Sequence, residues 1–203
     1  MYGRYIKRIE KRIENHSFAV IGTYHGSGST LLSVNFAAFL AKNFSGDVAV
    51  IEANGSGDFE KMAQCEEYCN HISKIEGGFR IGNIYYFYNV ARDFSAYLRS
   101  RKFAFFVYDM GIEFMRNEEI FLSCNQKIIV GSHLGWRMSR YEQLLSCAKM
   151  LEGYRSWEYI DMMKGDGAAY FIDEGRVKLK KMPVIEDALM VSDEAERIYQ
   201  SFL

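Results

Sequence analysis

The sequence lacks several features that mark other classes of protein. Its 203 residues contain one proline, Pro183, and no Ser/Gly-rich linker, so nothing indicates a domain boundary. The 25 basic and 26 acidic residues nearly cancel, which leaves no overall field to attract nucleic acid or an anionic membrane. No window approaches the ~18 consecutive apolar residues of a membrane span. We therefore expect one domain over residues 1–203 and no nucleic acid partner.

Cysteine is also scarce and has no framework spacing. The four cysteines are Cys65, Cys69, Cys124 and Cys147, and the first residues lack the apolar stretch of a secretory signal, so we expect a cytoplasmic location. Cys65, Cys69 and His71 lie close enough in sequence to suggest a metal site. A second ligand pair is missing, however, and cysteines four residues apart also meet on one helix face. We therefore do not expect a metal there.

Residues 1–16 are predicted to contain a basic amphipathic helix. The segment places one apolar stripe among basic residues, the stripe being formed by Tyr5, Ile6, Ile9 and Ile13. Such a helix could bind an acidic partner or lie on a membrane surface. Because Glu10 and Glu14 dilute the charge and the stripe is short, we favour a helix that packs on its own domain.

The chain then alternates between strand-like and helical patterns. Residues 18–22 and 47–53 are apolar runs typical of buried strands, and residues 30–43 between them have an apolar helical face. Buried strands separated by helices of ten or more residues are typical of a parallel sheet covered on both faces. The sequence therefore predicts an α/β fold, with a mainly parallel sheet between two layers of helices.

The remaining elements follow the same alternation. We predict helices over 58–75, 93–101, 117–124 and 137–151, and a last helix over 193–203 that Ser192 caps. We predict strands over 103–109, 127–131 and 157–163. Residues 79–88 are predicted to form one strand or a tight strand pair with its turn at Gly82-Asn83, and residues 169–172 and 177–181 an edge hairpin.

A glycine-rich loop joins the first strand to the first helix of this unit. It keeps the glycines and final hydroxyl of the phosphate-binding pattern G-x-x-x-x-G-K-[S/T], in which backbone amides hold phosphates and the hydroxyl holds Mg²⁺. Ser29 stands where the pattern has lysine. The predicted site for ATP or ADP with Mg²⁺ consists of Gly26, Ser27, Gly28, Ser29, Thr30 and Leu31.

A plainer interpretation of the loop stays open. The glycines could simply make a tight turn, Ser29 or Thr30 could cap the helix, and Asp109 could cap the loop amides. We favour a phosphate loop because the strand–turn–helix context is what the motif requires.

Three separated segments resemble the MinD/ParA class of P-loop ATPases. They are the loop with its helix, the segment Asp47-Val48-Ala49-Val50-Ile51-Glu52-Ala53-Asn54, and the Walker B-like segment Phe105-Phe106-Val107-Tyr108-Asp109-Met110-Gly111. The resemblance covers residues 17–60 and 100–135, and within the class it is closest to CpaE-type pilus-assembly ATPases.

The resemblance implies that catalytic residues have been lost. Active members read K-G-G-x-G-K-T, whereas here Tyr24 and His25 replace the leading Lys-Gly and Ser29 replaces the second lysine. Positive charge at the transferring phosphate is most of what phosphoryl-transfer catalysis consists of. The resemblance therefore implies a pseudo-ATPase.

The acidic positions differ from the class as well. Active members show D-x-D after the second strand, where this chain has Glu52 and Asn54. Asp109 fits the pattern, because it ends a strand at the edge where open α/β sheets bind ligands, and it could hold Mg²⁺ together with Thr30. The asparagine that reads adenine in the class is absent, and Asp161 or Met162 occupies its region.

Three further side chains are candidates near the loop. His25 lies inside it, and His133 and Arg137 follow a predicted strand that ends at the same edge. Arg137 would replace lost charge only if it pointed inward, and because most arginines are solvated we favour the solvated interpretation. We also favour a plain loop role for His133.

Three functions remain open at this point. The favoured one is a non-hydrolysing nucleotide-binding protein that acts on a protein partner, either as a homodimer or with a homologous ATPase. The second is an active ATPase that uses an unconventional cation, the candidates being Lys42, Lys61, Arg116 and Arg137. The third is a nucleotide-free scaffold, which the aromatic segment 85–88 favours because exposed aromatics anchor interfaces. Alternate residues of a strand face opposite ways, so we expect half of that segment to lie in the core.

Overall fold

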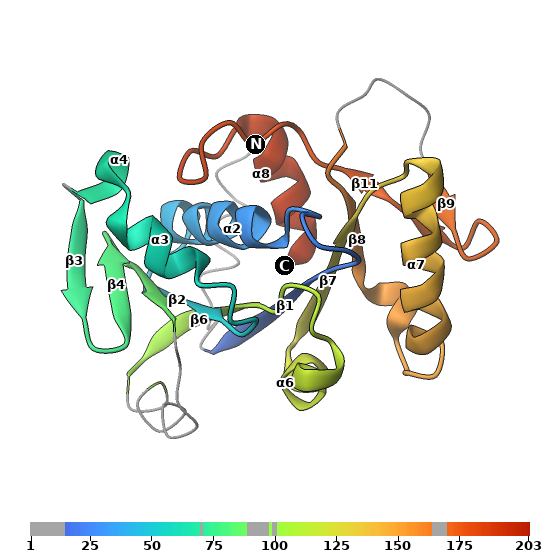
Figure 1. The fold of residues 1–203 in the computed structure, drawn as a ribbon, viewed down its shortest axis with the longest axis horizontal. Helices are drawn as coiled ribbons and strands as arrows, with labels where there is room; N and C mark the ends of the chain where they lie inside the picture. Colours follow the sequence, from blue (N-terminus) through green and yellow to red (C-terminus); the bar gives the residue numbers. More distant parts are fainter. Residues whose placement is uncertain (1–14, 70, 89–97, 99–100, 164–169) are drawn as a thin grey trace, which may run out of the picture.

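The computed structural model describes residues 15–69, 71–88, 98, 101–163 and 170–203. A nine-stranded sheet runs through the molecule, with helices on both of its faces (Figure 1). The α/β architecture predicted from the alternating pattern is thereby confirmed. Two predicted helices fall largely outside the described residues. They are the helix of residues 1–16, of which only Asn15 and the strand residue His16 are described, and the helix of 93–101.

The β-α-β unit forms as predicted. Strand β1 (His16–Gly22) leads through the glycine-rich loop into helix α2 (Ser29–Asn43), and strand β2 (Asp47–Glu52) follows. The apolar residues of both strands are buried, because helices cover the sheet on either side. A short loop joins Gly22 to Ser29, so the start of α2 lies at the carboxyl end of β1.

The other strands of the large sheet are β3 (Ile72–Ile75), β4 (Gly78–Ile81), β5 (Ile84–Phe87), β6 (Phe103–Asp109), β7 (Gln126–Gly131), β8 (Glu158–Asp161) and β11 (Lys180–Lys181). Their order is β11-β8-β7-β1-β6-β2-β5-β4-β3. Neighbours from β11 to β5 pair in parallel, whereas β5–β4 and β4–β3 pair antiparallel. Strand β6 thus lies between β1 and β2, which brings its carboxyl end beside the loop.

The predicted helix of 58–75 is wrong in its second half. Helix α3 (Asp58–Gln64) ends where Cys65 adopts an extended backbone, a short helix α4 (Glu66–Cys69) follows, and residues 72–75 form β3. Pairing with β4 outweighs the local helical preference. Strands β4 and β5 confirm the alternative of a tight strand pair that turns at Gly82-Asn83.

Helices α2, α3 and α8 (Asp193–Tyr199) cover one face of the sheet, and α6 (Glu118–Ser123) and α7 (Gly135–Ala148) cover the other (Figure 1). Short 3-10 turns span Met115–Asn117, Tyr154–Ser156 and Gln200–Phe202. The Ser192 hydroxyl accepts a hydrogen bond from the Ala195 amide at 3.2 Å, which confirms the predicted cap of α8.

The predicted C-terminal hairpin forms, but not at the edge of the large sheet. Strands β9 (Phe171–Ile172) and β10 (Val177–Lys178) make a separate two-stranded sheet. The edge position belongs to β11, which pairs in parallel with β8. Ile172 and Val177 are buried in the same apolar cluster as Tyr141 and Leu145 of α7, so side-chain packing holds the hairpin without pairing to the large sheet.

Candidate functional site

Four loops meet at the carboxyl edge of the sheet. They follow β1, β2, β6 and β7, which are parallel and adjacent or nearly so, and open α/β sheets bind their ligands at this edge. The glycine-rich loop after β1 lies among them (Figure 1). The site is therefore assembled from segments that are far apart in the sequence.

The glycine-rich loop has the backbone that a phosphate loop requires. Gly26 and Gly28 adopt φ of 78° and 95°, a left-handed region that favours glycine. Gly28 is the N-cap of α2, and no side chain caps this end of the helix. The alternative in which Ser29 or Thr30 caps the helix is therefore wrong. The free amides and the positive end of the helix dipole make this end of α2 suited to an anion.

Ser27 and Ser29 of the loop are buried, which the sequence pattern does not predict. Ser27 is 3% exposed, and no described group hydrogen-bonds its hydroxyl. It lies directly over Gly22, where an added Cβ would come within 2.1 Å of the Ser27 Oγ. The side chain of Ser29, which stands in the lysine position, is buried as well. A side chain at position 22 would therefore displace the Ser27 side chain.

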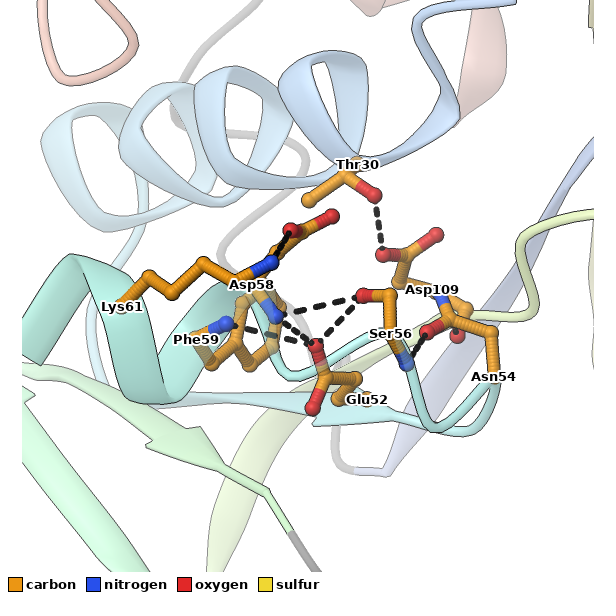
Figure 2. Close-up of polar contacts among 8 residues, drawn as sticks. All are labelled: Thr30, Glu52, Asn54, Ser56, Asp58, Phe59, Lys61 and Asp109. Atoms are coloured by element: carbon orange, nitrogen blue, oxygen red, sulfur yellow. Dashed lines mark hydrogen bonds and ion pairs between the residues drawn. The ribbon is translucent and has the colours of Figure 1, made fainter. Parts of the chain in front are cut away.

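Thr30 and Asp109 are brought together at the end of β6. The Thr30 hydroxyl donates to the Asp109 carboxylate at 2.7 Å (Figure 2). Burial raises the pKa of Asp109 to about 6, although the hydrogen bonds from Thr30 and from the Gly111 amide favour the ionised form. A hydroxyl and a carboxylate are the hard oxygen ligands that Mg²⁺ takes. These two residues would hold it.

No group of three His, Cys, Asp or Glu residues gathers as a metal cage within the described part of the chain. A magnesium ion held by Thr30 and Asp109 would therefore need oxygens from phosphate and water, as is usual for Mg²⁺ in nucleotide sites.

Glu52 is committed to the backbone of the neighbouring loop. Its carboxylate accepts hydrogen bonds from the amides of Asp58 and Phe59, at 2.8 and 3.2 Å, and from the Ser56 hydroxyl at 2.9 Å (Figure 2). It thereby satisfies the free amides at the start of α3. This capping role, rather than an orientation toward Thr30, occupies the carboxylate.

Asn54 links the loop after β2 to the end of β6 by hydrogen bonds. Its side-chain amide donates to the Asp109 carbonyl at 3.4 Å, and its oxygen accepts from the Ser56 amide at 2.8 Å. It also packs on Gly111, where an added Cβ would lie 2.8 Å from the Asn54 Cβ. Asn54 thus supports the position of Asp109 from behind.

His133 pairs with Asp161 across the ends of β7 and β8. Its Nδ1 forms a short hydrogen bond with the buried carboxylate, and its ring stacks on Tyr170 at 4.1 Å between centroids. Met162, next to Asp161, packs against the loop at Gly28. The other histidine candidate, His25 of the loop, has an exposed side chain. The structure therefore places His133 in a side-chain pair that the sequence did not reveal.

Arg137 is the candidate cation that contacts the loop. Its guanidinium lies 4.7 Å from the centroid of the Tyr24 ring and donates to the Tyr24 hydroxyl at 3.2 Å. The other candidates point to acidic partners elsewhere: Lys42 to Glu196, Lys61 to Asp58 and Arg116 to Glu113. The Arg137 side chain is partly buried against Tyr24 and is not fully solvated.

No protein-family model matches this chain, and no curated protein sequence does either. Among the described residues, no helix is long and apolar enough to cross a lipid bilayer.

Solved structures do match. A ParA family ATPase from Chlorobium tepidum superposes with a TM-score of 0.58 at 14% identity, over 94% of this chain and 91% of that one. A plasmid partition protein from Borrelia burgdorferi bound to AMPPNP gives 0.59 at 11%, over 93% and 96%. A nucleotide-binding protein from Archaeoglobus fulgidus in complex with ADP gives 0.50 at 11%, over 92% and 87%. With its parallel sheet and flanking helices, the chain has the α/β fold of ParA-type P-loop NTPases.

Proposed function

We propose that this protein binds ATP or ADP with Mg²⁺ at the loop of residues 24–31 and does not hydrolyse it efficiently. In this proposal the bound nucleotide controls a surface that a protein partner recognises. The partner is a second copy of the chain or a homologous ATPase.

One observation carries the proposal. The uncapped start of α2 lies beside a hydroxyl–carboxylate pair, Thr30 and Asp109, whose oxygens are 2.7 Å apart. The amides suit phosphate oxygens and the pair suits Mg²⁺, which when bound neutralises phosphate charge. Two of the solved structures with this fold hold AMPPNP and ADP, which supports a nucleotide as the ligand.

The absence of turnover rests on the missing lysines. Tyr24 and Ser29 stand at both lysine positions, and Glu52, the acidic residue nearest the D-x-D pattern, is engaged with backbone amides. Phosphoryl transfer depends on positive charge at the equatorial phosphate oxygens and on a group that orients the nucleophile. Neither is supplied by these three residues.

We also propose that the protein is most similar to CpaE-type ATPases within the class and that it is located in the cytoplasm. We further propose recruitment of a partner rather than a membrane, since the basic segment of residues 1–16 also carries acidic residues.

Calorimetric titration of the full chain with ATP and ADP, with and without Mg²⁺, tests the proposal. We expect micromolar, Mg-dependent binding and no phosphate release. Thr30→Val removes the hydroxyl and keeps the side-chain shape, so it should abolish the gain in affinity from Mg²⁺. The matched control is Ser45→Ala, which removes an exposed hydroxyl beyond the other end of α2.

Two outcomes would favour the other functions. Mg-dependent hydrolysis that Asp109→Ala abolishes would support an active ATPase. No binding at millimolar nucleotide would support a nucleotide-free scaffold, and its partner would then be sought at other surfaces of the protein.

A further inference from the structure

Within the described residues, Arg137 is a half-buried cation with no acidic counter-ion. Its guanidinium lies over the Tyr24 ring and donates a hydrogen bond to the Tyr24 hydroxyl, and Tyr24 has no carboxylate. Among the ion pairs of the described residues, none includes Arg137. A partly desolvated charge is costly unless it is compensated, so this position calls for an anion.

The electrostatic surroundings strengthen this conclusion. Arg137 lies in the first turn of α7, where the helix dipole disfavours a cation, and no acidic residue occupies that turn. The first turn of α2 has no acidic residue either. Both helices begin at the same edge of the sheet, because β1 and β7 are adjacent and parallel. Two positive helix ends and one guanidinium therefore share this edge.

The carboxylates of the edge already have partners. Asp161 accepts from His133, and Asp109 accepts from Thr30. Glu52 accepts from the amides at the start of α3. In the described structure they leave Arg137 unneutralised.

Tyr24 holds the guanidinium at the loop. The cation lies over the aromatic face and is also hydrogen-bonded to the hydroxyl, so its position is restrained by two contacts to one loop residue. Ser27, three residues further along the loop, keeps a buried hydroxyl that no described group satisfies. An unsatisfied buried polar group is unfavourable. A ligand would therefore satisfy both the Ser27 hydroxyl of the loop and the Arg137 guanidinium beside it.

We infer that Arg137 binds the phosphate groups of the ligand held by the loop, and so supplies from α7 the positive charge that the loop itself lacks. The inference rests on the proposed function and specifies how that site recognises its ligand. A planar guanidinium with several donors matches phosphate oxygens, and charge-assisted hydrogen bonds of this kind are about twice as strong as neutral ones.

The test compares variants of the full chain by calorimetry with Mg·ATP, Mg·ADP and inorganic tripolyphosphate. Arg137→Gln and Arg137→Met remove the charge, and the methionine keeps an apolar stem on Tyr24. Arg140→Gln is the matched control, because it removes an exposed arginine of the same helix whose guanidinium, among the described residues, hydrogen-bonds Gln143 alone. Circular dichroism melting identifies any variant that does not fold.

We expect both Arg137 variants to weaken ATP and tripolyphosphate binding by about 10- to 100-fold, the range for one lost charge-assisted hydrogen bond. The loss should shrink at high salt, and Arg140→Gln should bind like the unaltered protein.

The results separate two kinds of failure. If the unaltered protein binds and either folded Arg137 variant binds equally well, the inference is wrong and the proposed function stands. A variant that weakens ATP but not tripolyphosphate would also overturn it, because the contact would then be to base or ribose. If the unaltered protein binds none of the three ligands, the proposed function fails, and the inference fails with it.

Discussion

At the scale of single residues, burial changes the acid–base chemistry of Asp109. The side chain is fully buried, and its pKa rises from 3.8 to about 6. Between these values the folded chain keeps a proton that the unfolded chain has lost. The unfolded state thus binds fewer protons, so the stability of the ligand-free protein falls as pH rises through this interval.

Replacing Asp109 by asparagine should remove the loss of stability that ionisation of this buried carboxyl causes. We expect Asp109→Asn to stabilise the ligand-free protein at pH 7.5 by ~1–3 kcal/mol and to have little effect at pH 4, since two pKa units correspond to at most about 3 kcal/mol. Urea unfolding at the two pH values measures this. Glu142→Gln, at an exposed carboxyl of α7, is the control. An equal effect at both pH values would contradict the prediction.

Ser29 is the second residue-scale test. Ser29→Lys restores the charge that the phosphate-loop pattern carries, so we expect affinity for Mg·ATP to rise about tenfold or more. Ser45→Lys adds the same charge at an exposed position beyond the far end of α2 and should change affinity little. Calorimetry of both variants measures the difference. No gain in Ser29→Lys would mean that Tyr24 or His25 has reshaped the loop.

At the scale of elements, Asn35 ties the C-terminal segment to α2. Its buried side-chain amide donates to the carbonyls of Asp187, Ala188 and Met190, at 3.3, 3.1 and 2.9 Å. Its oxygen accepts from the Tyr199 hydroxyl of α8 at 2.8 Å. The helix that begins at the glycine-rich loop is thus held to the C-terminal segment by a buried polar side chain.

We expect Asn35→Ala to destabilise the fold by ~2–4 kcal/mol, because it leaves several buried polar groups without partners. Asn43→Ala, on the exposed last turn of α2, should cost less than about 1 kcal/mol since its bond is to its own helix. Chemical denaturation of both variants gives the comparison. Equal losses would show that the buried network contributes nothing beyond an ordinary surface amide.

Helices and strands were predicted correctly where they follow from a local apolar pattern. The predictions failed where pairing with a distant strand determines the structure. The apolar strand 47–53 and the helix 30–43 appear with nearly the predicted bounds. Residues 72–75 instead join a strand, because β4 offers backbone partners that no local pattern encodes. The same reason places Lys180 and Lys181 beside β8 instead of in the predicted hairpin.

At the scale of the whole molecule, the central strand β1 connects two apolar cores. Strand β1 contributes Phe18 and Val20 to the core under α2 and α8, and Ala19 and Ile21 to the core under α6 and α7. Alternate residues of a strand face opposite sides of the sheet. Loss of one core therefore removes support from the other.

We expect the protein to unfold in one cooperative transition. At about 0.7 kcal/mol per residue near 60 °C, a chain of 203 residues melting as one unit should show an unfolding enthalpy of about 140 kcal/mol. Scanning calorimetry measures it together with the van't Hoff enthalpy, which should agree. Two transitions, or a calorimetric value well above the van't Hoff value, would indicate separate units.

The sequence by itself determined the β-α-β unit, the glycine-rich loop and the candidacy of Thr30 and Asp109, because these depend on short-range periodicity and on motif spacing. Only the tertiary structure decided which side chains meet. Thr30 and Asp109 are 79 residues apart, and Tyr24 and Arg137 are 113 apart. Their contacts depend on the strand order, which places β6 and β7 on either side of β1. Strand order is set by long-range packing that a local pattern does not contain.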